Sequence, residues 1–169
     1  MDNTDLLIKT EIKSSTIAGA GKGRFFLENC KRGTIIRIQL IGSELLTFNS
    51  VSELKDANKD LTINFGHSKS KNSTIDTDTD RDTIYINNVP LYTNHSLNNN
   101  IAFLYFSDRK ITYTTRDVYS GEEILQNYCD YTEVPWYEDY LHSIGEISLR
   151  EFGERDLANN SEVIVGEWI

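Results

Sequence analysis

The polar stretch Tyr92-Thr93-Asn94-His95-Ser96-Leu97-Asn98-Asn99-Asn100 lies between two segments, residues 83–89 and 101–106, that are rich in apolar and β-branched residues. Residues of these types favour β-strands, so we expect a polar loop between two strands. A run of Asn and Thr shortly after a Pro is ordinary turn chemistry. The stretch therefore gains a function only through the motifs that surround it along the chain.

Length and composition indicate one domain. The chain has 169 residues, of which 38% are hydrophobic and 11% aromatic, enough to bury one sizeable core. No run approaches the roughly 18 apolar residues of a membrane helix, and the first residues lack a signal-peptide pattern. We therefore expect an intracellular protein that does not contact a membrane. Cys30 and Cys129 are too few for a disulfide framework and form no CxxC pair, so we expect two reduced thiols and no metal site.

The charge balance is acidic. Twenty-six Asp and Glu residues outnumber seventeen Lys and Arg residues, which gives a formal net charge of −9. A protein that neutralises phosphates needs a basic surface, so this balance argues against direct nucleic-acid binding. It fits a basic partner, although acidic charge also serves solubility alone. The oligomeric state is not indicated by the sequence.

A glycine-rich loop, residues 18–24 (AGAGKGR), lies between two predicted strands, residues 6–12 and 34–40. Glycines at alternate positions leave the backbone bare and allow a ligand to approach main-chain groups. The spacing is not GxGxxG, and Gly23 stands where a Walker loop requires Ser or Thr, so neither phosphate-binding motif applies. We expect a glycine hairpin, with or without a ligand at its backbone.

The middle of the chain is a polar insert, residues 66–82, preceded by a short predicted helix at 50–58 that opens on an S-x-x-E capping pattern. Four aspartates alternate near the end of the insert: Asp76, Asp78, Asp80 and Asp82. This run imitates a calcium loop, but Arg81 replaces the Gly of that turn and Asn87 replaces its bidentate Glu. We expect a solvated acidic loop, which is also a candidate contact for a basic substrate.

The second half of the chain is predicted to be β-rich up to residue 131 and mostly helical thereafter. Beyond the two strands that flank the central stretch, we expect a strand at 110–115 and, after a turn at 116–124, one more short strand. The composition changes at Val134. The spacing after it predicts helices at 135–141 and 147–154 and a closing strand at 161–169.

Several short motifs follow one another in a definite order. They are Gly21-Lys22-Gly23, Gly33 before a strand, Gly42-Ser43-Glu44, Asn94-His95-Ser96 with Asn100, Arg116-Asp117 with Gly121-Glu122-Glu123, and Tyr128. In this order they resemble the SET-domain family of protein lysine methyltransferases, over about Ile8 to Trp136. Each motif alone is common, whereas the ordered set is specific.

The resemblance implies a mainly β fold, in which several small sheets surround a C-terminal pseudoknot and short helices lie in the insert and the tail. The segment that ends at Tyr128 would thread beneath the loop that holds Asn94 and His95. General rules of chain topology would not propose this, because threaded connections are almost absent from proteins. The SET domain would span residues 1–133, and a C-terminal segment, residues 134–169, would close the cofactor and lysine channel.

The resemblance also implies a cofactor, S-adenosylmethionine, in a pocket on one face, with a substrate lysine entering from the other. The backbone of Ala20, Gly21 and Lys22 would contact the cofactor. Asn94 and His95 would lie beside it, with main-chain contacts to the adenine and a side-chain contact from Asn94. Two aromatic residues complete the cofactor site: Tyr128 falls on the family's active-site tyrosine, and Trp136 is the candidate to stack on the adenine. The alternative for Trp136 is packing within the core of the tail.

Methyl transfer to lysine requires a neutral amine aligned with the departing sulfur, because an ammonium cannot attack. A tight aromatic channel lowers the pKa of the lysine by desolvation, and proximity then does most of the work without a metal. The Tyr128 hydroxyl would orient the amine, and nearby carbonyls would hold the methyl through weak C–H···O contacts. Phe103, after Asn100, would leave room for more than one methylation; its alternative is a plain core residue.

Four positions depart from the family's pattern: Leu97, Asn99, Asn127 and Cys129. A cysteine-rich zinc module is also missing, so the tail itself would close the lysine channel. The aromatic residues available for this are Tyr131, Trp136, Tyr137 and Tyr140.

Three functions remain as hypotheses. The first is a lysine methyltransferase for a histone tail or a similar basic peptide, nuclear or chromatin-associated if the host is eukaryotic. The second is a methyltransferase for a non-histone protein side chain. The third is a catalytically inert, peptide-binding SET module.

Overall fold

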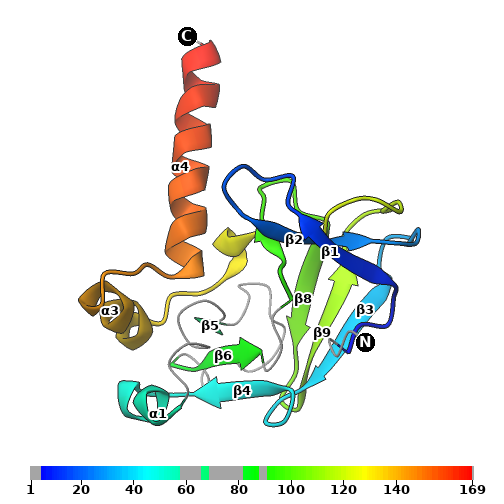
Figure 1. Cartoon of the computed structure of the whole chain (residues 1–169). Helices are drawn as coiled ribbons and strands as arrows, with labels where there is room; N and C mark the ends of the chain where they lie inside the picture. Colours follow the sequence, from blue (N-terminus) through cyan, green and yellow to red (C-terminus); the bar gives the residue numbers. More distant parts are fainter. Residues whose placement is uncertain (1–4, 58–65, 69–81, 88–90, 169) are drawn as a thin grey trace.

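The computed structural model describes residues 5–57, 66–68, 82–87 and 91–168, and the side chains of the last helix as far as residue 159 (Figure 1). Four small sheets form in these ranges, ordered β1-β2, β3-β9-β8, β4-β6-β5 and β10-β7. The strands are β1 Thr10–Ser14, β2 Lys22–Phe26, β3 Ile35–Leu40, β4 Leu45–Phe48, β5 Gly66–His67, β6 Ile84–Asn87, β7 Asn94–His95, β8 Ile101–Tyr105, β9 Arg109–Thr114 and β10 Leu125–Gln126. The helices are α1 Val51–Asp56, α3 Pro135–Ser143 and α4 Leu149–Trp168, with a 3-10 turn, η2, at Tyr128–Asp130.

The glycine-rich loop connects β1 and β2 in an antiparallel hairpin. A hairpin is expected here from the sequence, but between strands at 6–12 and 34–40; the partner of β1 is Lys22–Phe26, and the strand predicted at 34–40 is β3, which pairs with β9. Gly19 and Gly21 adopt φ angles of +78° and +75°. Residues that carry a side chain rarely adopt this left-handed backbone conformation, so these two positions of the loop require glycine.

The three-stranded sheet β3-β9-β8 carries the main core on its inner face. Phe103 and Tyr105 of β8 point inward and join a cluster with Phe26, Ile36 and Tyr131. The inner face of the central strand β9 is polar in sequence, because the alternation of RKITYT buries Lys110, Thr112 and Thr114. This sheet therefore presents a buried amine to the interior of the protein.

A second core lies between α1, β6 and α3. Leu54 of α1 and Ile84 and Ile86 of β6 pack against Tyr137 and Leu141 of α3. The predicted cap of α1 is confirmed, since the Glu53 backbone N–H donates to Ser50 Oγ at 3.2 Å. Most of the polar insert at 66–82, including the calcium-like run up to residue 81, lies outside the described residues.

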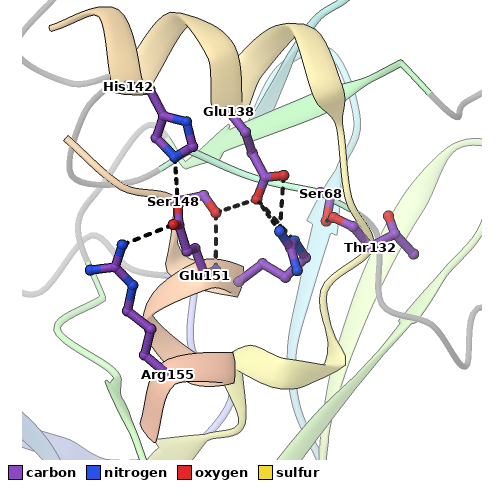
Figure 2. Close-up of polar contacts among 8 residues, drawn as sticks. Ser68, Thr132, Glu138, His142, Ser148, Glu151 and Arg155 are labelled. Atoms are coloured by element: carbon purple, nitrogen blue, oxygen red, sulfur yellow. Dashed lines mark hydrogen bonds and ion pairs between the residues drawn. The ribbon is translucent and has the colours of Figure 1, made fainter. Parts of the chain in front are cut away.

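The C-terminal segment forms two helices rather than two helices and a strand. A closing strand is expected from the sequence at 161–169, but α4 continues as a single helix to Trp168 and projects away from the sheets (Figure 1). The Glu138 carboxylate of α3 holds the start of α4 by accepting from Arg150 Nε at 2.9 Å and Ser148 Oγ at 2.6 Å (Figure 2). None of the helices in the described ranges is both long and apolar enough to cross a bilayer.

Candidate functional site

The short parallel pair β7–β10 brings the central stretch and the segment before Tyr128 side by side. Asn94 pairs with Leu125, and His95 pairs with Gln126. Asn100, only 1% exposed, reinforces the pair: its Nδ2 donates to the Glu123 carbonyl at 2.7 Å, and its Oδ1 accepts from the Leu125 backbone N–H at 2.9 Å. The buried side-chain amide of Asn100 therefore makes hydrogen bonds to a backbone carbonyl and a backbone N–H of a segment more than twenty residues further along the chain.

His95 lies directly against Tyr128, with the two ring centroids 5.0 Å apart. The Tyr128 backbone N–H, which can only donate, approaches His95 Nδ1 at 3.0 Å. Nδ1 is therefore the acceptor, and Nε2 carries the proton toward Asp156 Oδ2 of α4 at 3.0 Å. The Tyr128 hydroxyl donates to the Thr93 carbonyl at 3.1 Å. Backbone and side chain of Tyr128 are thus both held by the stretch around β7.

Asn94 and Glu123 tie this stretch to the glycine hairpin. Asn94 Nδ2 lies 2.9 Å from the Lys22 carbonyl and 3.0 Å from Glu123 Oε1. Burial alone raises the pKa of the Glu123 carboxyl, but hydrogen bonds from Thr16, Asn94 and Ser15 outweigh it and bring the pKa below its usual value. A Cβ on Gly23 would clash with Glu123 Oε1, so a side chain at this position would displace the Glu123 carboxylate from its hydrogen bonds. The sequence singled out Glu123 as part of a motif without assigning this role.

One cavity, of about 460 Å³, opens between the glycine hairpin and α4; we call it the hairpin cavity. Its lining residues are Ile17, Ala18, Gly19, Ala20, Asn94, His95, Tyr128, Glu146, Ile147, Ser148, Leu149 and Phe152. The ring of Phe152, 52% exposed, stands edge-on to His95 at 5.9 Å and to Tyr128 at 6.1 Å between centroids. The cavity thus combines an exposed backbone loop with one accessible aromatic ring.

A second cavity, of about 270 Å³, also has Tyr128 in its lining; we call it the aromatic cavity. Its lining residues are Ala20, Lys22, His67, Asn87, Leu91, Tyr92, Thr93, Asn94, Phe103, Lys110, Gln126, Tyr128, Tyr131 and Leu149. Ala20, Asn94, Tyr128 and Leu149 line both cavities. Tyr128 therefore stands in the wall between them. Burial raises its pKa to about 12, so its hydroxyl remains protonated at neutral pH.

The structure brings together most of the residues expected from the sequence. Ala20, Asn94 and Tyr128 line both cavities, His95 lines the hairpin cavity, and Lys22 and Phe103 line the aromatic cavity. Gly21 belongs to the same hairpin but lines neither cavity. Its left-handed φ shapes the loop beside Ala20.

Trp136 is not brought to either cavity. Its Nε1 donates to the Asp82 carbonyl at 2.6 Å, and its ring packs against the second core beside Tyr137. The alternative of core packing describes this position, because α3 begins at Pro135 and lays Trp136 against the second core. Phe152 instead brings an exposed aromatic ring to the hairpin cavity. The sequence predicts a helix in this region but does not single out Phe152.

Sequence reasoning also missed three polar residues of the aromatic cavity: Gln126, His67 and Lys110. Gln126 Nε2 donates to Thr93 Oγ1 at 2.9 Å, and its Oε1 accepts from the Tyr131 hydroxyl at 2.6 Å. No pattern within β9 or β10 alone marks Lys110 and Gln126 as buried; their positions depend on the pairing with β8 and β7. Over the described part of the chain, no group of three or more His, Cys, Asp or Glu side chains gathers as a metal site.

Comparison with protein families matches residues 21–129 to the SET domain. The chain belongs to the SET-domain family, whose members are generally protein-lysine methyltransferases. The mainly β fold expected from the sequence is thereby confirmed. No curated protein matches the chain.

Solved structures show the same fold. A chain of a humanized mutant of the Chaetomium thermophilum Polycomb Repressive Complex 2, bound to the inhibitor GSK343, is 20% identical with a TM-score of 0.51, covering 75% of this chain and 16% of that chain. A chain of the Chaetomium thermophilum Polycomb Repressive Complex 2 bound to GSK126 is 18% identical with a TM-score of 0.52, covering 80% of this chain and 17% of that chain. A chain of ctPRC2 in an autoinhibited conformation bound to S-adenosylmethionine is 18% identical with a TM-score of 0.50, covering 75% of this chain and 16% of that chain. This chain thus spans less than a fifth of those chains, and at these identities the likeness concerns the fold.

Proposed function

We propose that this chain is an S-adenosylmethionine-dependent protein-lysine N-methyltransferase that acts on a basic peptide such as a histone tail. The observation that carries the proposal is that the hairpin cavity and the aromatic cavity share Tyr128 in their common wall. A cofactor on one side and an amine on the other would then approach each other beside one protonated phenol. Direct methyl transfer needs the cofactor and the substrate to enter separately and the amine to be aligned with the methyl group where they meet.

The hairpin cavity has the chemistry to hold the cofactor, which when bound supplies an activated methyl group on a sulfonium. The backbone of the hairpin around Gly19 and Ala20 is open to main-chain contacts. The contacts of the Asn94 side chain with the described residues all use Nδ2, which leaves Oδ1 to accept from a ligand amine. Phe152 offers a face for the adenine ring. A structural neighbour described as bound to S-adenosylmethionine supports the same cofactor.

The aromatic cavity has the chemistry to hold a lysine amine. Phe103, Tyr128 and Tyr131 surround it with rings, and such an environment disfavours the ammonium and leaves more of the amine neutral. The Tyr128 hydroxyl gives its hydrogen to Thr93, so its lone pairs are free to accept from the amine and to orient it. Phe103 brings no hydroxyl to the cavity, which leaves room for more than one methylation.

The substrate class follows from charge. A net charge of −9 attracts basic peptides and repels nucleic acids, which supports a histone tail or a similar sequence. Such a substrate would place the protein in the nucleus or on chromatin in a eukaryotic host. We assign the C-terminal segment, residues 134–169, to closure of the hairpin cavity through α4.

Two measurements on the full chain test this function. Calorimetric titration with S-adenosylmethionine should show binding; a chain that does not bind it is a peptide-binding module at most, and both methyltransferase hypotheses then fail. Labelled methyl transfer to a panel of histones and peptides, read by mass spectrometry, should mark lysines. Label that reaches other proteins of a lysate but no histone would replace the histone substrate by a non-histone one.

A further inference from the structure

The aromatic cavity contains a lysine of the protein itself. Lys110 lies on the central strand β9, on the inner face of the sheet, and its side chain is 3% exposed. It lines the same cavity as Tyr128 and Phe103. An amine that belongs to the protein is therefore already present where the proposed substrate amine would be received.

The surroundings of Lys110 Nζ are those of an amine held between rings. Nζ lies 4.0 Å from the centroid of the Phe103 ring and 5.4 Å from that of Tyr105. Among the described residues that line this cavity there is no Asp or Glu. Aromatic faces stabilise alkylated ammonium groups as well as simple ones, so the setting accommodates both the amine and its methylated product.

His67 fixes the direction of the hydrogen bond at Nζ. Its Nδ1 lies 3.1 Å from the Ser68 carbonyl, which can only accept, so Nδ1 carries the proton. Its Nε2, 3.3 Å from Lys110 Nζ, is then an acceptor, and Lys110 donates to it. Once Nζ is uncharged, this arrangement leaves its lone pair unused by His67.

Electrostatics favour that uncharged form. Burial, and then the charge of Arg37, lower the pKa of Lys110 well below its usual value. Lys13 is a natural contrast: its Nζ also lies over a ring, 4.4 Å from the centroid of Phe25, but it is half-exposed and paired with Glu11 at 2.9 Å. Lys13 therefore shares the ring contact of Lys110 but not its burial.

We propose that Lys110 is a methyl acceptor in the protein's own reaction, an intramolecular modification site inside the aromatic cavity. The inference rests on the proposed function, because it needs the same methyl donor. The Nζ lone pair forms the new N–C bond as the S–C bond breaks, and the electrons of that bond stay on sulfur, which leaves as a neutral thioether. The secondary ammonium then releases one proton through His67 Nε2 to water.

The first test uses the wild-type protein with isotopically labelled S-adenosylmethionine and no added substrate. Tandem mass spectrometry of the digested chain should find the label on Lys110 and not on Lys13, at a first-order rate independent of protein concentration. Label on Lys13, or a rate that rises with protein concentration, would indicate transfer between molecules and overturn the inference. Lys110→Arg should abolish the label.

The same preparation incubated with the histone panel separates this inference from the proposed function. If peptides become labelled while Lys110 does not, the inference is wrong and the proposed function stands. If the chain binds no cofactor and labels neither peptides nor itself, both the proposed function and the inference are wrong.

A second readout needs no cofactor. Pulse acylation with acetic anhydride over a range of pH reports the fraction of each amine that is uncharged. Lys110 should reach its full reactivity at a lower pH in the folded protein than in the urea-unfolded chain, because burial disfavours its charge. Coincident pH profiles of Lys110 in the folded and unfolded chains would show that the fold does not favour the uncharged amine, and the inference would be wrong.

Discussion

The two sides of Tyr128 are held by different kinds of contact. On the β side, the β7–β10 pair, the buried Asn100 and the His95 ring fix its backbone through hydrogen bonds. On the α4 side, Gly153 brings the helix backbone against η2, while a hydrogen bond from His95 Nε2 to the half-exposed Asp156 and the exposed Phe152 ring complete the contact. The β side therefore sets the geometry of the chemistry, and the α4 side shapes the proposed cofactor site. Substitutions on the two sides should accordingly change different quantities.

The largest effect on activity is expected at Tyr128, which lines both cavities. Tyr128→Phe removes the hydroxyl that orients the amine, and kcat should fall by about 10²–10³-fold, as on loss of one positioned hydrogen-bonding group. Cofactor affinity, measured by calorimetry, should stay within a small factor, because the ring and the backbone contacts remain. An unchanged turnover would remove Tyr128 from the mechanism.

On the β side, Asn100→Ala should destabilise the whole protein. It leaves the Glu123 carbonyl and the Leu125 N–H without the Asn100 side-chain hydrogen bonds, at a cost of about 2–4 kcal/mol in the free energy of unfolding. Urea titration measures this change. The matched control is Asn98→Ala, at an exposed position of the same loop, which should alter stability by less than about 0.5 kcal/mol. Equal effects of the two changes would contradict the role of Asn100.

On the α4 side, Gly153→Ala should push the helix away from Tyr128. The new Cβ would lie 2.8 Å from both the Cys129 nitrogen and the Tyr128 Cβ, and overpacking of this kind costs about 1–3 kcal/mol. We expect a lower Tm together with weaker cofactor binding. Asn159→Ala, exposed on the same helix, is the control and should leave both unchanged. A Gly153→Ala protein with normal cofactor affinity would show that α4 does not shape the site.

Phe152 and Trp136 separate cofactor binding from stability. Phe152→Ala removes an exposed ring of the hairpin cavity and should weaken cofactor binding by about 1–2 kcal/mol with little change in Tm. Trp136→Ala should lower Tm instead, because Trp136 packs against the second core and donates to the Asp82 carbonyl. Calorimetry and thermal melts on both variants decide this, and the reverse pattern would return the adenine contact to Trp136.

The smallest effect concerns stability and pH at Lys110. Because the pKa of Lys110 is lowered in the fold, the unfolded chain binds more protons between the folded pKa and about 10.4, and stability rises with pH over that window. Lys110→Met should therefore raise Tm at neutral pH, by about 2–4 °C per kcal/mol regained, with the gain shrinking as pH rises. Lys13→Met is the surface control. A gain in Tm that does not depend on pH would mean that the fold does not lower the pKa of Lys110.

Local chemistry and motif order made much of the β side predictable. The glycine hairpin, the capped α1 and the strands around Asn94 all follow from residue types and turns, and the SET resemblance added the neighbourhood of Asn94 and Tyr128. The α4 side was less accessible. Residues 161–169 have strand-like composition, but a strand needs a neighbour to pair with, whereas a helix that starts at Leu149 extends through its own hydrogen bonds.

Lys110 illustrates a second limit of sequence reasoning. The pattern RKITYT suggests that the Lys and Thr positions face solvent, yet β9 is central and shares its inner face with Ile101, Phe103 and Tyr105 of β8. Register with the neighbouring strand, which periodicity within one strand does not specify, decided which face is buried.

The account depends most directly on transfer of a methyl group from S-adenosylmethionine to a lysine amine. Mass spectrometry of a histone and peptide panel, incubated with the wild-type chain and the labelled cofactor, measures this in one experiment. We predict label on lysine side chains of basic peptides that is strongly reduced by Tyr128→Phe. A wild-type chain that binds the cofactor but labels no lysine, on the panel or on itself, would contradict the proposed function.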